Sequence, residues 1–156
     1  MKFRNHFVVL STIIIGFWLE NIINQFTVPF FIEFNLGFLI FCYWVFAMPE
    51  MLKSLAALAY GLFIDLFFSN AIGFHMLFFS GTSYIIHLYV FRFRIFSYLQ
   101  LSIFFAGFSI FYLACRYLIF SSINYSYLLL LVSFIFNAVA WLGVYFLMRG
   151  FRRKFF

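Results

Sequence analysis

Long apolar runs separated by short polar breaks follow one another along the whole chain. In runs such as 36–48 and 127–136, apolar residues would occupy every face of a helix, whereas the strands of a membrane barrel alternate apolar and polar residues. A helix needs about 20 apolar residues to cross a bilayer. The pattern therefore predicts an all-α polytopic membrane protein, a bundle of about six transmembrane helices in one integral domain over residues 1–156. The spans are expected at about 7–26, 30–48, 52–69, 72–91, 97–120 and 127–148.

The breaks between these spans contain residues that favour turns. Pro29 opens the second predicted span and Pro49 closes it. Residues 69–70 and Gly73 mark a tight turn after the third span, and residues 121–126 form the other polar connection on that side. Five spans would result if the turn around Gly73 were misjudged.

Basic residues indicate the orientation of the helices. If the N-terminus is cytoplasmic, nine of the ten Lys and Arg residues fall on the cytoplasmic side, as the positive-inside rule requires. Both termini are then cytoplasmic and the number of spans is even. A secretory signal peptide also begins with a basic segment, but polar residues follow the first apolar run where a small-residue cleavage site would lie. The nine residues are Lys2, Arg4, Lys53, Arg92, Arg94, Arg149, Arg152, Arg153 and Lys154.

Composition limits the class of protein. Hydrophobic residues make up 67% of the chain and charged residues 9%, which is too few to cover a soluble domain of this size. The net charge of +6 does not indicate a nucleic-acid partner, because the basic residues form short clusters between apolar runs. Cys42 and Cys115 fall within predicted spans and are interpreted as apolar packing residues.

Four charged residues fall at a similar level in the outer part of the predicted bundle. At 1.5 Å per residue, Asp65 lies about 20 Å into the third span and Arg116 about 27 Å along the fifth; Glu20 and Glu33 lie nearby. Charges at membrane depth are unfavourable unless they are paired, reach the headgroups or face water. Arg116 could therefore meet Asp65 or Glu33 in a polar cavity or docking site, or Arg116, Glu20 and Glu33 could reach the headgroups. Asp65 is deeper and shorter, and we expect it to have a structural or functional role.

Two spacings of four residues place side chains on common helix faces. Ala57, Gly61 and Asp65 share one face of the third predicted helix, where small residues allow close packing. Tight packing is the simpler interpretation of this face, and a ligand cavity is the alternative. Asn137 and Trp141 share a face of the sixth helix, where an interhelical hydrogen bond is expected.

Residues typical of catalysis do not converge in the sequence. It contains no glycine-rich phosphate loop, no His-x-x-x-His with an acid and no cysteine pair. His75 and His87 have no partner at metal-ligand spacing on their own helices. We therefore expect no enzymatic activity, no metal and no cofactor. A lipid-modifying enzyme would need an acid, base or nucleophile cluster that the sequence does not assemble.

Three central segments carry a family resemblance: Tyr-Trp-Val-Phe-Ala-Met-Pro at 43–49, Tyr-Gly-Leu-Phe-Ile-Asp-Leu at 60–66 and Ile-Gly-Phe-His-Met-Leu at 72–77. In their order and spacing they resemble the MreD family, the small membrane subunit of the bacterial rod-shape system. Ala57 stands where many relatives have Gly; alanine is also small, so this face of the third predicted helix keeps its small residues. Arg116 has no assigned counterpart in the family. The likeness continues at 94–96, Gln100, 137–141 and 146–149.

The resemblance implies a multi-pass scaffold without enzymatic activity in the bacterial cytoplasmic (inner) membrane. It implies direct binding to MreC, with MreB, RodA and a penicillin-binding transpeptidase in the same assembly during lateral peptidoglycan synthesis. The candidate structural or partner-contact residues are Tyr43, Trp44, Pro49, Ala57, Gly61, Asp65, Gly73, Asn137 and Trp141, and Glu33 and Arg116 are the candidate intramembrane charges.

A second resemblance, between the MreD-like fold and that of a class of transporter subunits, suggests an alternative function. MreD-like proteins resemble the six-helix substrate-binding subunits of energy-coupling-factor vitamin transporters, in which an outward-facing cavity holds a small molecule. Under this alternative, Asp65, Arg116 and Glu33 would line that cavity. A transporter subunit would retain a vitamin after purification and depend on an ATPase module, whereas a shape protein would co-purify with MreC.

Overall fold

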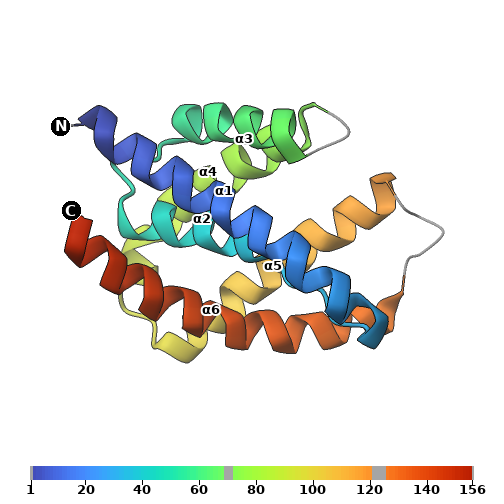
Figure 1. Ribbon diagram of the computed structural model, residues 1–156. Coiled ribbons are helices and arrows are strands. Elements are labelled where there is room, and N and C mark those ends of the chain that lie inside the picture. Colours follow the sequence, from blue (N-terminus) through green and yellow to red (C-terminus); the bar gives the residue numbers. More distant parts are fainter. Residues whose placement is uncertain (1, 69–71, 121–125, 156) are drawn as a thin grey trace.

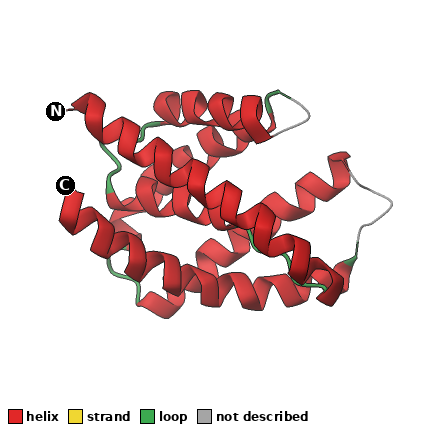
Figure 2. Ribbon diagram, in the orientation of Figure 1, coloured by secondary structure: helices red, strands yellow, loops and turns green. Residues whose placement is uncertain are grey.

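The computed structural model describes residues 2–68, 72–120 and 126–155. Within these ranges every regular element is helical, which confirms the all-α prediction (Figure 2). The elements are α1 (Lys2–Thr27), the 3-10 helix η1 (Val28–Phe30), α2 (Leu36–Ala47), α3 (Ser54–Phe68), α4 (Phe74–Phe93), α5 (Tyr98–Phe120) and α6 (Tyr127–Phe155).

Helix α2 lies at the centre of the bundle and the other helices pack around it (Figure 1). It contacts α1, α4, α5 and α6, while α3 pairs with α4 and α5 pairs with α6. Aromatic rings fill the space around it. Phe41 stacks on Phe79 with ring centroids 3.9 Å apart, and Phe105 stacks on Trp141 at 4.1 Å. Buried aromatic rings of this size contribute much of the apolar area that a core removes from its surroundings.

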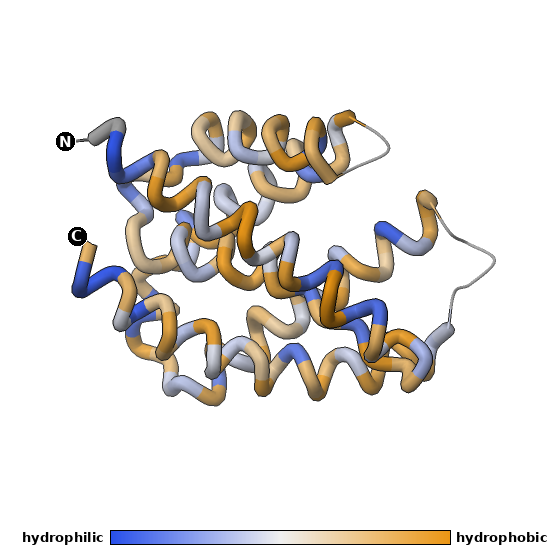
Figure 3. Tube along the Cα trace, viewed as in Figure 1, coloured by the Kyte–Doolittle hydropathy of each residue, from blue (hydrophilic) through white to orange (hydrophobic). Residues whose placement is uncertain are grey.

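Four helical segments are long and apolar enough to cross a membrane: Arg4–Phe30, Phe74–Phe93, Tyr98–Phe120 and Tyr127–Phe155. Helices α2 and α3 are shorter, with 12 and 15 residues, which corresponds to about 18 Å and 22 Å. The structure therefore contains the six predicted helices, and the crossing of the membrane by all six stays a prediction. Figure 3 shows that hydrophobic residues follow the helices and that hydrophilic residues gather near both chain ends.

Helix α2 begins later than the second predicted span, and the position of the span itself stays a prediction. Pro29 lies inside η1, which continues directly from α1, and α2 begins at Leu36, six residues after the predicted start of the span at residue 30. The proline ring fixes φ at a value that suits the first turn of any helix. Pro29 therefore fits the start of the short η1 as well as the start of a longer helix. Pro49 does follow the end of α2 at Ala47. The predicted turn residues 69–70 and most of the connection 121–126 lie outside the described residues.

Gly73 precedes α4 with a φ of 112°, a conformation that favours glycine. The chain turns back here so that α4 can pack along α3. Gly61 sits at their contact: a Cβ built on it would lie 2.5 Å from the Cα of Met76 and 2.6 Å from the carbonyl oxygen of His75. Ala57 and Asp65 on the same face are also buried. The close approach of α3 and α4 therefore requires glycine at position 61.

Replacing Gly61 with alanine is expected to push α3 away from α4, because the new methyl group would overlap backbone atoms. Overpacking of this kind destabilises by about 1–3 kcal/mol. The melting temperature of the purified protein in detergent should fall. In Gly143→Ala, where the added methyl group meets open space, it should stay level or rise slightly. Equal melting temperatures for the two variants would contradict the close contact.

Candidate functional site

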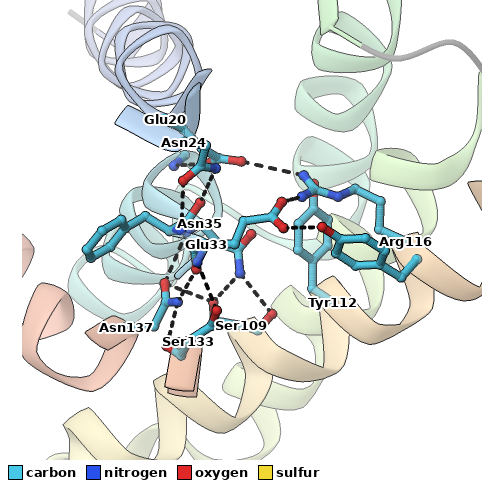
Figure 4. Close-up of polar contacts among 12 residues, drawn as sticks. Glu20, Asn24, Glu33, Asn35, Ser109, Tyr112, Arg116, Ser133 and Asn137 are labelled. Atoms are coloured by element: carbon cyan, nitrogen blue, oxygen red, sulfur yellow. Dashed lines mark hydrogen bonds and ion pairs between the residues drawn. The ribbon is translucent and has the colours of Figure 1, made fainter. Parts of the chain in front are cut away.

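A short non-helical segment, residues 31–35, connects η1 to α2 and is held by side chains (Figure 4). The backbone N–H of Glu33 donates to the Ser133 hydroxyl at 2.8 Å, and that of Phe34 donates to the Asn24 side-chain oxygen at 2.9 Å. The Asn24 amide group donates back to the Phe34 carbonyl at 2.9 Å. Irregular backbone at membrane depth is tolerated where protein groups replace the missing hydrogen bonds. These side chains therefore allow the chain to break before α2.

Asn137 on α6 is fully buried and joins this segment to α6. Its side-chain oxygen accepts from the Asn35 N–H at 3.0 Å, and its amide group donates to the carbonyls of Glu33 and Ser133, both at 2.8 Å. The Asn35 side chain in turn donates to the Ser109 hydroxyl on α5 at 2.8 Å. The interhelical hydrogen bond expected of Asn137 comes from the Ser109 hydroxyl of α5, at 3.4 Å, and the start of α2 is fixed against α5 and α6.

Two buried acids converge on Arg116 of α5. Its guanidinium group is paired with the Glu33 carboxylate, and Nη1 lies 3.6 Å from Oε1 of Glu20. The Tyr117 hydroxyl donates to Glu33 at 2.6 Å, and the Gly37 N–H donates to Glu20 at 3.0 Å. The carboxylates are almost fully enclosed, whereas 28% of the Arg116 side chain is exposed. We call Glu20, Glu33 and Arg116 the acid–arginine cluster.

This cluster decides between the interpretations that the sequence left open. Of the two pairings considered for Arg116, the structure contains the one with Glu33 and not the one with Asp65. The headgroup interpretation is wrong for Glu20 and Glu33, because both side chains are buried inside the protein. Arg116 supplies the opposite charge that makes this burial possible.

Asp65 accepts hydrogen bonds at the start of α4. Its carboxylate receives the backbone N–H groups of Gly73 at 2.8 Å, His75 at 3.1 Å and Met76 at 3.3 Å. The first N–H groups of a helix have no partner within the helix, and a carboxylate from α3 satisfies them here. Asp65 therefore caps α4 from the neighbouring helix, and its role in the described fold is structural.

His75 extends this contact to a third helix. Its Nδ1 lies 2.7 Å from the Asp65 carboxylate and its Nε2 lies 2.7 Å from the Tyr112 hydroxyl of α5. A carboxylate only accepts, so Nδ1–H donates to Asp65, and Nε2 of a neutral imidazole accepts from Tyr112. The Arg116 guanidinium lies 5.7 Å from the centre of the Tyr112 ring. Tyr112 therefore connects the Asp65–His75 pair to the acid–arginine cluster.

The predicted aromatic contact residues lie inside the bundle. Tyr43, Trp44 and Trp141 are each at most 1% exposed. The Trp44 indole N–H donates to the Thr12 hydroxyl at 2.9 Å, and Trp141 stacks on Phe105. Their burial favours the structural alternative over direct contact with a partner.

Pro49 contributes through its backbone. Its carbonyl oxygen lies 2.7 Å from Nε2 of His87 on α4. This contact joins the end of α2 to α4, so Pro49, like the aromatic residues, has a place in the internal packing.

The sequence did not identify several residues of the polar network as site residues. His75 was considered only as a metal ligand on its own helix, whereas its partners Asp65 and Tyr112 lie on other helices. Its position ten residues after Asp65, across the predicted turn, was the available signal. The amide and hydroxyl groups that hold residues 31–35 carried a weaker signal, as isolated polar residues in apolar runs: Asn24, Asn35, Ser109 and Ser133.

A protein-family model matches nearly the whole chain. Residues 1–152 match the family model described as rod shape-determining protein MreD. No curated protein and no solved structure matches the chain. The matched region contains the acid–arginine cluster, the Asp65–His75 pair and residues 31–35, so the whole polar network lies within it.

Asp65→Asn is expected to lower the protein level in membranes and the melting temperature in detergent. Both carboxylate oxygens accept N–H donors, so an amide NH₂ in either orientation would face donors. An unsatisfied buried group is unfavourable by about 1–3 kcal/mol. Glu50→Gln is the matched control, because Glu50 is exposed. A normal level and melting temperature for Asp65→Asn would rule out the capping role.

Arg116→Met is expected to destabilise the protein more than Glu33→Gln does, because it leaves two buried acids without an opposite charge. In the double variant Arg116→Met/Glu33→Gln, the fall in melting temperature should be smaller than the sum of the falls in the two single variants. Directly coupled residues show interaction energies of about 0.5–3 kcal/mol. Arg116→Met combined with Glu50→Gln should be additive. Additivity in both combinations would show that Arg116 and Glu33 are not coupled.

Proposed function

Because the chain belongs to the MreD family of rod shape-determining membrane proteins, we propose that it is a non-enzymatic scaffold that binds MreC and supports lateral peptidoglycan synthesis. MreB, RodA and a penicillin-binding transpeptidase are the further members of the proposed assembly. The observation that carries the proposal is the family match over residues 1–152.

The hydrogen bonds of the buried acids support the proposal of a scaffold. Glu20, Glu33 and Asp65 accept hydrogen bonds from other parts of the bundle, and their partners lie on different helices. A general acid or base needs a reacting group within hydrogen-bond reach, whereas these carboxylates are occupied in holding helices together. Such an interior gives a bundle with a fixed shape, which a membrane scaffold requires.

We further propose that the protein lies in the bacterial inner membrane with both termini in the cytoplasm. Both termini lie at the same end of the bundle (Figure 1). Basic residues gather in the last turn of α6, including Arg152, Arg153 and Lys154, and Arg4 lies near the start of α1. The positive-inside rule assigns such an end to the cytoplasm.

All six helices are proposed to cross the membrane. The 12-residue helix α2 does not reach across on its own, but residues 31–35 extend it, and side chains satisfy their backbone N–H groups. Helix α3 pairs along α4, which is long enough to span. Both short helices are therefore compatible with a single integral membrane domain.

One observation favours the transporter alternative as a second candidate. Transporters bind their substrates beside irregular backbone at membrane depth, and residues 31–35 form a non-helical connection between η1 and α2. The side-chain oxygen of Asn35 is buried there and has no hydrogen-bond partner among the described residues. A small-molecule-binding subunit of an energy-coupling-factor-type transporter would use this oxygen, and mass spectrometry of the purified protein should then find a vitamin.

Depleting the protein from its rod-shaped host is expected to turn the cells into spheres, because lateral wall growth would lose a scaffold subunit. An affinity-tagged copy should restore rods and co-purify with MreC. A tagged, unrelated polytopic protein controls for non-specific capture. Cells that stay rod-shaped, together with a tagged protein that carries a vitamin and no MreC, would favour the transporter alternative.

A further inference from the structure

An apolar groove runs between α1 and α3 on the outside of the bundle. Its volume is about 440 Å³, within the range of ligand pockets, about 300–1,000 Å³. Ala59 is exposed to the groove, with the exposed rings of Phe7 and Phe63 beside it. The lining residues are His6, Phe7, Leu10, Ala56, Ala59, Tyr60 and Phe63.

Cations flank the groove at one end. Arg4 precedes Phe7 by three residues and Lys53 precedes Ala56 by three, and both cations are exposed. Both helices begin at the end of the bundle where the chain termini lie (Figure 1). His6 and Tyr60, whose side chains are hydrogen-bonded at 2.8 Å, join the helices near this end. The groove is therefore lined mainly by apolar residues, and on each side an exposed cation lies within one helical turn before the first lining residue.

We propose that the groove holds an acyl chain of an anionic phospholipid whose phosphate lies between Arg4 and Lys53. An acyl chain fits a narrow apolar groove through dispersion contacts with its walls. These contacts distinguish poorly between phospholipids, because different phospholipids have similar acyl chains. The charge of the two cations selects the anionic headgroup.

A transmembrane helix of a partner protein fits the groove less well. The positive-inside rule places basic residues at the cytoplasmic end of such a helix, where they would meet Arg4 and Lys53. The inference goes beyond the proposed function and takes from it only the orientation, which makes the bound lipid one of the cytoplasmic leaflet.

The test is a competition between phosphatidylglycerol and phosphatidylethanolamine with identical acyl chains, added to the purified full chain in neutral detergent. Native mass spectrometry measures the ratio of the two bound lipids. The unaltered protein should prefer phosphatidylglycerol. Arg4→Gln and Lys53→Gln should each lower this preference about fivefold, the effect expected of one cation near a headgroup. Equal binding of the two lipids by the unaltered protein would overturn the proposal.

Filling the groove tests the position of the chain. Ala59→Phe should remove most of the retained lipid, whereas Val139→Phe, on an exposed face of α6, should retain it. Melting temperatures verify that both variants fold, and Ala59→Leu replaces Ala59→Phe if the latter does not. If the filled variant retains as much phosphatidylglycerol as the unaltered protein, the proposal is overturned.

The same variants separate this inference from the proposed function. Loss of MreC capture in Ala59→Phe with unchanged lipid binding would assign the groove to a partner helix and overturn the proposal. Lipid selection in detergent does not depend on membrane orientation or on MreC, so it can hold even if the scaffold function or the orientation fails.

Discussion

The pairing of Arg116 with Glu20 and Glu33 is the interaction on which the arrangement of the helices depends. A lone carboxylate in a low-dielectric interior is strongly unfavourable, and two side by side repel each other. The two acids come from α1 and from the segment before α2, and the arginine comes from α5. The pairing with Arg116 lowers the cost of burying these acids, and it forms only when these three parts of the chain meet.

Glu33 reaches Arg116 from the break before α2. The backbone N–H groups of residues 33–35 in this non-helical segment do not donate to helix carbonyls. Ser133 and Asn137 of α6 and Asn24 of α1 accept from those groups. Hydrogen bonding by short polar side chains thus compensates for the helical hydrogen bonds that this segment lacks.

How much the sequence predicted depends on the range of each interaction. The apolar runs predicted the helices, because hydropathy and periodicity are local properties. They did not predict the start of α2, since Pro29 is compatible with the start of η1 as well as with that of a span, and the side chains that hold residues 31–35 come from α1 and α6. The shared helix face of Ala57, Gly61 and Asp65, all three buried, followed from their spacing. The pairing of Asp65 with His75 did not, because that contact depends on how α4 turns back along α3.

Most of the acids are buried whereas most of the described basic residues lie at the surface, and this difference in burial separates structural roles from surface roles. Three of the four acids, Glu20, Glu33 and Asp65, are buried and bonded to other helices, while the fourth, Glu50, is exposed. Arg152 near the C-terminus donates to the Ala47 carbonyl at 3.1 Å and so supports the end of α2. Arg4 and Lys53 remain exposed. Because three of the four acids are bonded inside the bundle, these surface cations have few carboxylates to pair with, and the anionic headgroups proposed above would supply opposite charge.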